Sequence, residues 1–192
     1  MKSVLISIRP KWCEKIASGE KTIEVRKSAP KKVPFKAYIY ETKHATEMPW
    51  VDEDGHFIYK GRGQVIGEFI CDEVEEFHEW ELSPQGKFAE FEEERLEKFL
   101  SATCLSISEV VRYRENLPYY KQLYGWHISD LKIYDEPKEL SEFYRICKTP
   151  CKPSNGKILC ITTKSLKMNG CDGKIHLTRP PQSYMFVEEV EQ

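Results

Sequence analysis

The runs of strand character in this chain are short and irregularly spaced, and helices do not alternate with them. A doubly wound parallel sheet requires regular alternation of strands and helices, so this pattern excludes that class. The runs are rich in β-branched and aromatic residues or alternate with a period of two. They are SVLISI, TIEVRKS, FKAYIYET, QVIGEFICDEVEEF, YGWHISDLKIYDEPKELSEF and SYMFVEEV. Together with one helix near the start, they predict an α+β protein built on a small mixed β-barrel.

The first part of the chain has the pattern of a strand, a short helix and a second strand. Pro10 ends the first strand and can open a helix, because the first turn of a helix does not use its backbone N–H. Gly19 is a candidate C-terminal cap, since glycine tolerates a left-handed backbone. TIEVRKS follows, and we expect it to pair with FKAYIYET as a neighbouring strand.

A helical insertion is predicted near residues 90–118. The run EEERLEKFLSATCL places Leu96, Phe99 and Leu100 on one face of a helix. Ser108 is a candidate N-cap for a second helix, SEVVRYREN, because its hydroxyl can accept from a backbone N–H of the first turn.

The composition, with 40% hydrophobic residues, is that of an ordinary globular domain, and residues 1–192 are expected to form one domain. No apolar run approaches the roughly 18 residues that a membrane span needs. The start MKSVLISIRPKW alternates charged and apolar residues where a secretory signal would have a continuous apolar block. These features predict a cytoplasmic protein with no membrane partner.

Charge is distributed unevenly along the chain. Residues 1–43 carry eleven Lys and Arg against four Asp and Glu, and residues 144–179 carry eight against one. Residues 44–101 are acidic, with five basic and sixteen acidic residues. Two basic segments brought together by folding can bind phosphate, whereas the alternative is that each run coats a solvated face. The acidic middle argues against broad coverage by nucleic acid.

The stretch GEKTIEVR combines strand alternation with a high density of charge. In a strand from Thr22, the side chains of Thr22, Glu24 and Arg26 project to one face, and the aliphatic residues between them project to the other. Lys21 lies at the turn just before and can share a pocket with the charged face. Alternation usually means a core on one side and water on the other. The charged face is therefore either solvated or the wall of a site.

The stretch SIRPKWCEKIASGEKTIEVRK resembles the opening of an ASCH domain, a PUA-like β-barrel family with a Gly-x-Lys-x-x-Glu-x-Arg signature after the first strand and helix. Gly19, Lys21, Glu24 and Arg26 fill the signature positions. YGWHISDLKIYDEPKELSEF and RPPQSYMFVEE are also similar to ASCH proteins of phages and gut bacteria, so the resemblance spans most of the chain. It implies a PUA-like barrel related to RNA-binding barrels, with a cleft between the first helix and the barrel that can hold a nucleotide or base.

The resemblance implies two functions. The first is a module that binds RNA or a modified nucleotide, in which Lys21, Glu24 and Arg26 read a base edge and a phosphate. The second is an amidohydrolase. A subset of small ASCH proteins removes the acetyl group from N4-acetylcytidine with a lysine at the position of Lys21, a threonine at that of Glu24 and a glutamate from a later helix. In that case Lys21 is the base or activator and Glu24 the proton donor. Because glutamate stands here where that subset has threonine, binding is the favoured interpretation.

The chemistry of a lysine beside a glutamate also favours binding. Lys21 can act as a base only if burial lowers its pKa substantially from about 10.4, and an ionised Glu24 nearby raises that pKa. As a binding pair, the carboxylate accepts from an exocyclic amine such as cytosine N4, while Lys21 and Arg26 donate to carbonyl or phosphate oxygens. A purely structural ion pair between Lys21 and Glu24 is the alternative.

Five further residues are weaker candidates for substrate or ligand contacts. Trp126 in YGWHIS can stack on a base, although a lone tryptophan in a strand more often belongs to the core. His127 lies on the opposite face by alternation, so at most one of the two lines a given pocket. Arg9 at the end of the first strand, and Ser183 and Tyr184 after the proline pair, complete the set.

Four of the seven cysteines lie in a basic excursion near residues 145–178. Cys147, Cys151, Cys160 and Cys171 are separated by three, eight and ten residues. Four thiolates can hold a structural zinc ion, although these spacings do not form two short pairs and free cysteines are also good core residues. A structural zinc site is therefore one expectation, and no cofactor is expected to be required for function.

Overall fold

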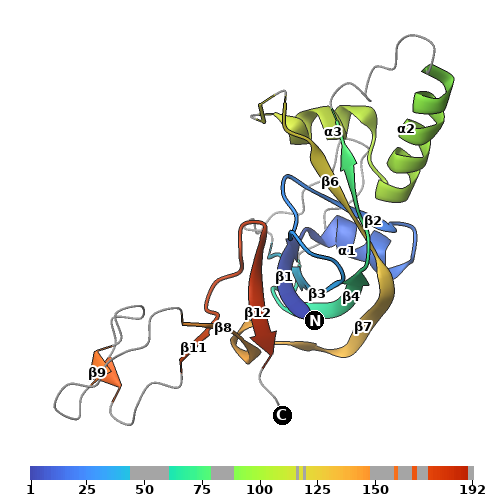
Figure 1. The fold of residues 1–192 in the computed structure, drawn as a ribbon. Helices are drawn as coiled ribbons and strands as arrows, with labels where there is room; N and C mark the ends of the chain where they lie inside the picture. Colours follow the sequence, from blue (N-terminus) through green and yellow to red (C-terminus); the bar gives the residue numbers. More distant parts are fainter. Residues whose placement is uncertain are drawn as a thin grey trace.

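The structure, a computed structural model, describes most of the chain. The described residues are 1–43, 61–78, 89–115, 117–118, 120–147, 158–159, 166–167 and 173–189. The elements follow the chain in the order β1 (Lys2–Ile8), α1 (Pro10–Ala17), β2 (Ile23–Arg26), β3 (Phe35–Glu41), β4 (Val65–Cys71), β5 (Val74–Phe77), α2 (Ala89–Thr103), α3 (Ile107–Arg114), β6 (Leu123–His127), β7 (Ser129–Lys138), η2 (Leu140–Glu142), β8 (Phe143–Ile146), β9 (Ile158–Leu159), β10 (Leu166–Lys167), β11 (Lys174–His176) and β12 (Tyr184–Glu189). Figure 1 shows their arrangement.

Most strands belong to a seven-stranded sheet in the order β11-β8-β12-β1-β3-β4-β7. β1 and β3 run parallel, and the other neighbours are antiparallel. The sheet curls around its core (Figure 1), but its outermost strands, β11 and β7, do not pair with each other within the described residues. The predicted α+β class is confirmed, with a strongly curled sheet in place of a closed barrel.

A second, three-stranded antiparallel sheet has the order β2-β6-β5. Glu24 of β2 lies opposite Trp126 of β6, and Trp126 lies opposite Val74 of β5. The predicted pairing of TIEVRKS with FKAYIYET is therefore wrong, because β3 lies between β1 and β4 in the larger sheet. Strand character alone does not specify the partner, since pairing depends on which faces are buried together.

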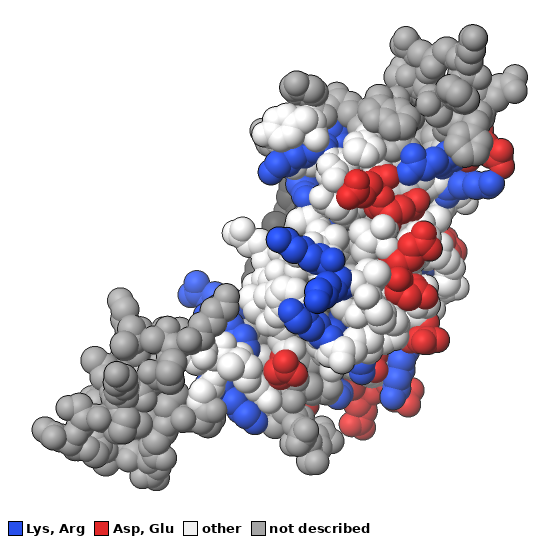
Figure 2. Space-filling view, viewed as in Figure 1, with Lys and Arg blue, Asp and Glu red and all other residues white. Residues whose placement is uncertain are grey.

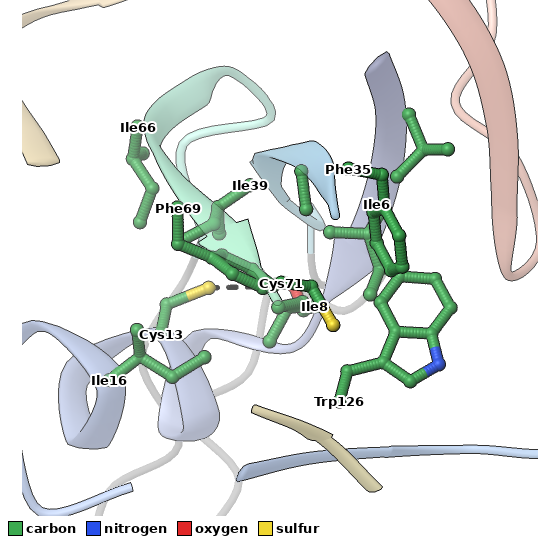
Figure 3. Packing of buried hydrophobic residues seen from close by; sticks show 12 residues of the cluster. Ile6, Ile8, Cys13, Ile16, Phe35, Ile39, Ile66, Phe69, Cys71 and Trp126 are labelled. Carbon is green, nitrogen blue, oxygen red and sulfur yellow. Dashed lines mark hydrogen bonds between the residues drawn. The ribbon is translucent and has the colours of Figure 1, made fainter. Parts of the chain in front are cut away.

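The main hydrophobic core includes residues of the larger sheet, α1 and the small sheet (Figure 3). Ile6 of β1 and Ile16 of α1 are fully buried in it. Trp126 is fully buried as well, and its ring meets Phe35 and Tyr184 edge-on, with centroids 5.0 Å apart in both pairs. Trp126 thus joins the small sheet to the larger one.

The opposite face of the small sheet packs against the mid-chain helices. Val25, Phe77 and Leu123 of this sheet share a core with Leu96 and Phe99 of α2. The rings of Phe77 and Phe99 are stacked, with centroids 4.2 Å apart. The amphipathic helix predicted in this segment is confirmed, and both faces of β2 are buried.

The helix ends follow their capping residues. Pro10 opens α1, and Gly19 lies just beyond its C-cap with φ +80°, a left-handed backbone that favours glycine, as predicted. The prediction for α3 is wrong, because its N-cap is Ser106 and not Ser108. The Ser106 hydroxyl accepts from the Glu109 N–H, and the Glu109 carboxylate accepts from the Ser106 N–H. These reciprocal bonds form a capping box that starts the helix earlier. None of the described helices is long and apolar enough to cross a membrane.

Candidate functional site

Lys21, Glu24 and Arg26 lie together at the junction of α1 and β2, and we call them the Lys-Glu-Arg cluster. The Lys21 N–H donates to the Lys15 carbonyl at 2.9 Å, which closes the turn after α1. β2 then carries Glu24 and Arg26 on one face, because alternate residues of a strand share a face.

The three side chains form a row of ion pairs. Lys21 Nζ lies 3.4 Å from Glu24 Oε2, and Arg26 Nη2 lies 2.9 Å from Glu24 Oε1. Each carboxylate oxygen of Glu24 therefore faces a cation. With all three groups ionised, two positive charges meet one negative charge, and the cluster is suited to a further anion or acceptor.

The cluster is buried, in contrast to a solvated strand face. Lys21 is 3% exposed, Glu24 6% and Arg26 7%. Burying a charge is costly unless the charge is paired and hydrogen-bonded. Groups of buried ionisable side chains are concentrated at functional sites, so burial strengthens the interpretation of this strand face as the wall of a site.

Two backbone carbonyls hold the cations in place. Lys21 Nζ donates to the Thr103 carbonyl at 2.7 Å, and Arg26 Nη2 donates to the Ser7 carbonyl at 2.6 Å. Thr103 is the last residue of α2, and the terminal carbonyls of a helix favour a cation because they have no acceptor role within the helix. The site therefore ties α2 and β1 to β2.

Burial lowers the pKa of the Lys21 ammonium group below its ordinary value, and the neighbouring Glu24 carboxylate opposes that shift without cancelling it. Lys21 Nζ also lies 5.3 Å from the centre of the Trp12 ring, whose face attracts a cation. Desolvation is therefore a larger effect on the pKa of Lys21 than the neighbouring carboxylate of Glu24.

Two buried donors on this side of the small sheet have no hydrogen-bond partner among the described residues. They are Arg26 Nε and Trp126 Nε1. Trp126 lies opposite Glu24 in the β2–β6 pair, so its side chain projects to the same face as those of Glu24 and Arg26. Unpartnered buried donors are rare in proteins, which makes both groups candidates for contacts with a ligand acceptor.

Trp126 and His127 project to opposite faces, as alternation predicts. The Trp126 ring is fully buried between Phe35 and Tyr184, so it has no face open for stacking on a base. His127 lies on the other side of the sheet, where its Nε2 is 3.7 Å from Glu75 Oε1. The structure therefore separates His127 from the Lys-Glu-Arg cluster.

The remaining sequence candidates lie near the end of β1. The Ser7 N–H donates to the Ser183 carbonyl at 3.1 Å, and the carbonyl of the same Ser7 accepts from Arg26. Arg9 is exposed and is the N-cap residue of α1. The structure thus links Ser183 to the cluster through Ser7 and leaves Arg9 open to solvent.

The sequence candidates omit three residues of the site, Ser7, Thr103 and Tyr113. Ser7 and Thr103 act through their backbone carbonyls, which leave no side-chain signal in a sequence. Tyr113 of α3 lies close enough to the cluster for the charges of Arg26 and Glu24 to act on its phenol. Burial raises the pKa of the Tyr113 phenol, Arg26 lowers it and Glu24 raises it. The one signal for Tyr113 was an aromatic residue among the charges of VVRYRE.

The structure describes the cysteine cluster only at its first member. Cys147 follows β8, and its N–H donates to the Gly173 carbonyl at 2.7 Å. Cys151, Cys160 and Cys171 lie outside the described residues. Within the residues that are described, no three His, Cys, Asp or Glu side chains are grouped so that they could hold a metal ion.

The chain is similar to one known family and to solved structures of that family. Residues 6–137 match the ASCH domain. A point mutant of ZmASCH from Zymomonas mobilis is 16% identical, with a TM-score of 0.54, and the match covers 97% of this chain and 89% of that one. The ASCH protein from Zymomonas mobilis is 16% identical, with a TM-score of 0.50 and 99% of each chain covered. No curated protein matches the sequence.

The two solved structures agree with the fold, and the family match identifies the chain. The match includes the Lys-Glu-Arg cluster and ends at Pro137 in β7, whereas β8, β11 and β12 follow it. Since residues 6–137 are more than half of the 192 residues, this protein belongs to the ASCH domain family, with the PUA-like fold predicted from its sequence.

Proposed function

We propose that this protein binds RNA or a modified nucleotide through the Lys-Glu-Arg cluster. One observation carries the proposal. Three ionisable side chains are buried together, and the Nε of one of them, Arg26, has no hydrogen-bond partner among the described residues. A cluster with excess positive charge and a spare donor suits an anionic or acceptor-rich ligand. The relation of PUA-like barrels to RNA-binding barrels, which the resemblance implies, agrees with this ligand class.

Each member of the cluster has its own role in this proposal. Arg26 uses Nη2 to bind the protein and offers Nε to a phosphate or carbonyl oxygen. Glu24 accepts from an exocyclic amine such as that of cytosine, since each carboxylate oxygen has more than one lone pair. Lys21 compensates the charge of Glu24, and Trp126 Nε1 supplies a second donor on the same face.

A second candidate is an amidohydrolase that removes an acyl group from N4-acetylcytidine or a similar nucleoside. The observation that favours it is the lowered pKa of Lys21, because a lysine must lose its proton before it can act as a base. In this alternative Lys21 takes a proton from water, and Glu24 donates one to the leaving nitrogen. Against it, glutamate occupies position 24, where the ASCH deacetylases have threonine.

The two candidates differ in whether the ligand is consumed. We would titrate the full-length protein with cytidine 5′-monophosphate and with N4-acetylcytidine by calorimetry, and follow cytidine release from N4-acetylcytidine by chromatography. The binding proposal predicts affinity without turnover. Arg26→Gln should weaken that affinity about tenfold or more, because hydrogen bonds from a charged group are strong. Lys98→Gln, at a side chain that is 75% exposed on α2, is the matched control and should leave the affinity unchanged.

Three outcomes decide between the candidates. Turnover that is lost in Lys21→Ala would contradict a purely binding role and support the amidohydrolase. Binding without turnover, lost in Arg26→Gln, would support the binding module. If the wild-type protein neither binds nor hydrolyses these ligands, and RNA binding is unaffected by Arg26→Gln, the cluster is a structural ion-pair network and both candidates fail.

For the cysteine excursion we propose a structural zinc ion held by Cys147, Cys151, Cys160 and Cys171. Four thiolates in a short basic segment support this proposal, because small segments without a large core often depend on a metal. Mass spectrometry of the purified protein should find about one zinc per chain, and Cys151→Ser should lower that content while Cys104→Ser does not. Less than about half an equivalent in the wild type would contradict the site.

A further inference from the structure

The last strands of the chain form a sheet face beyond the segment that matches the ASCH domain. β12, β8 and β11 are neighbours at one end of the seven-stranded sheet, and all three follow residue 137. Tyr144 of β8 lies opposite both His176 of β11 and Glu188 of β12. Because cross-strand partners and alternate residues share a face, Tyr144, His176 and Phe186 project to the same side. We call these three residues the aromatic face.

The aromatic face is open to solvent. Phe186 is 48% exposed and its neighbour on the same side, Ile146, is 59% exposed. His176 is exposed and Tyr144 partly so. The ring centroids of Tyr144 and His176 are 5.8 Å apart. Aromatic rings therefore lie side by side on a surface that water reaches.

The other side of β12 and β8 is buried, whereas the side of the aromatic face joins the main core only toward β1, where Val4 lies opposite Phe186. Phe143 and Val187 alternate with Tyr144 and Phe186, and both are buried in a further, separate core with Leu5. The aromatic face is not needed to fill that core. Contiguous exposed apolar side chains of this kind mark interaction sites on soluble proteins.

Cations accompany the exposed rings. Lys2 Nζ lies 5.3 Å from the centre of the Phe186 ring, and Lys174 Nζ lies 4.5 Å from that of Tyr144. Residues 148–172, which join β8 to β11 in the sequence, contain five Lys and one Asp. Figure 2 shows Lys and Arg side chains bordering uncharged surface in the region where Figure 1 shows β12 and β1. Rings interleaved with cations are typical of surfaces that bind single-stranded nucleic acid.

We propose that the aromatic face binds single-stranded RNA. Phe186 and Tyr144 stack on unpaired bases, and Lys2 and Lys174 contact the phosphates. A stacked base gains more than an exposed cation gains from a ring, so an incoming base displaces the ammonium group, which then meets a phosphate. The inference deepens the proposed function, on which it rests for the class of ligand.

Tyr184 connects the aromatic face to the Lys-Glu-Arg cluster. Its ring centroid lies 6.3 Å from that of Phe186 and 5.0 Å from that of Trp126. Trp126 Nε1 is one of the two unpartnered donors described above. Tyr184 therefore lies between the exposed rings of the aromatic face and the buried Trp126 beside the cluster.

The test uses the full-length protein and a fluorescein-labelled oligouridine of about 12 nucleotides, a length within the range that such surfaces bind. Fluorescence anisotropy gives the Kd at low and at moderate salt. Phe186→Ala and Tyr144→Ala should each weaken binding about five- to a hundredfold, and Phe186→Trp should retain it. Lys2→Gln should weaken binding and reduce its salt dependence. Tyr120→Ala, at a tyrosine that is 67% exposed elsewhere, is the matched control and should leave the Kd unchanged.

Substitution of Glu188 is expected to strengthen RNA binding, in contrast to the variants above. Its carboxylate is exposed on the side of Tyr144 and repels a phosphate. Glu188→Gln should therefore tighten RNA binding, whereas a structural role would weaken it or leave it unchanged.

The outcomes separate this inference from the proposed function. RNA binding that is insensitive to both Phe186→Ala and Tyr144→Ala overturns the inference, and so does equal affinity for a duplex of the same length. If those variants lose RNA while the wild type also fails to bind cytidine 5′-monophosphate and Arg26→Gln changes nothing, the aromatic face stands and the cluster proposal fails. If the wild type binds the nucleotide but no RNA, the cluster stands and the aromatic face fails.

Discussion

Glu24 is the residue on which the Lys-Glu-Arg cluster depends, because its carboxylate lies between two buried cations. Glu24→Gln would leave Lys21 and Arg26 without this counter-ion. Breaking a buried ion pair costs about 3–5 kcal/mol, so we expect the free energy of unfolding in urea to fall by about 3 kcal/mol at neutral pH. Glu20→Gln, at the exposed pair with Lys15, is the control and should not move the urea midpoint. A fall as small as that of a surface pair would contradict the buried network.

Glu75 provides a prediction about pH. Burial raises the pKa of its carboxyl group above the ordinary value, while His127 and Arg95 lower it and Glu73 raises it. The native state then holds the proton more tightly than the unfolded chain, so this group stabilises the fold below about pH 4, and the benefit is lost as the pH rises through the raised pKa. Glu75→Gln should therefore increase stability at neutral pH and have little effect in acid.

Urea unfolding of Glu75→Gln and the wild type near pH 4 and near pH 7 checks this prediction. Glu76→Gln, the neighbouring carboxylate on the opposite face of β5, is the matched control. An equal effect of Glu75→Gln at both pH values would mean that the change acts through packing and not through the proton.

At the scale of elements, α3 depends on its capping box. Ser106→Ala removes the acceptor of the Glu109 N–H, and loss of such a cap costs about 1 kcal/mol. For a chain of this size the melting temperature should fall by about 2–4 °C, measured by circular dichroism. Ser108→Ala is the control, since its hydroxyl lies 3.0 Å from the Ser106 hydroxyl and is not the cap. A larger fall in Ser108→Ala would reverse the assignment.

The elements themselves were predictable where their signals are local. Pro10 and Gly19 mark the two ends of α1, and the spacing of Leu96 and Phe99 marks the buried side of α2. The sequence predicts the start of α3 too late, because two serines, Ser106 and Ser108, compete as caps. The choice between them depends on Glu109, whose side chain bonds back to Ser106.

At the scale of the whole molecule, Trp126 holds the two sheets together. Trp126→Ala would leave a cavity between Phe35 and Tyr184 and should cost about 3–5 kcal/mol in the free energy of unfolding by guanidinium chloride. Trp126→Phe keeps part of the packing and should cost less. Tyr120→Ala, at an exposed ring, is the control. A loss below about 1 kcal/mol for Trp126→Ala would mean that the junction of the sheets does not depend on this ring.

The candidate site is also a property of the whole molecule. The carbonyl that binds Arg26 comes from Ser7 in β1, and the one that binds Lys21 comes from Thr103 at the end of α2. Tyr113 of α3 and Trp126 of β6 add to its surroundings. The protein thus assembles the site from five elements, of which GEKTIEVR supplies only one.

The sequence by itself determined what depends on near neighbours. Alternation placed Glu24 and Arg26 on one face of a strand and Trp126 and His127 on opposite faces, because side chains of a strand alternate whatever the strand pairs with. The signature residues and their order were likewise readable without a fold.

Only the tertiary structure decided which faces are buried and which strands are neighbours. The charged face of β2 lies inside because Trp126, Thr103 and Ser7 surround it from distant parts of the chain. The same alternation leaves Phe186 exposed, although its pattern resembles that of a core strand. Local periodicity indicates that a strand has two different faces. Which face is exposed to water depends on the free energy gained when other surfaces pack against the strand.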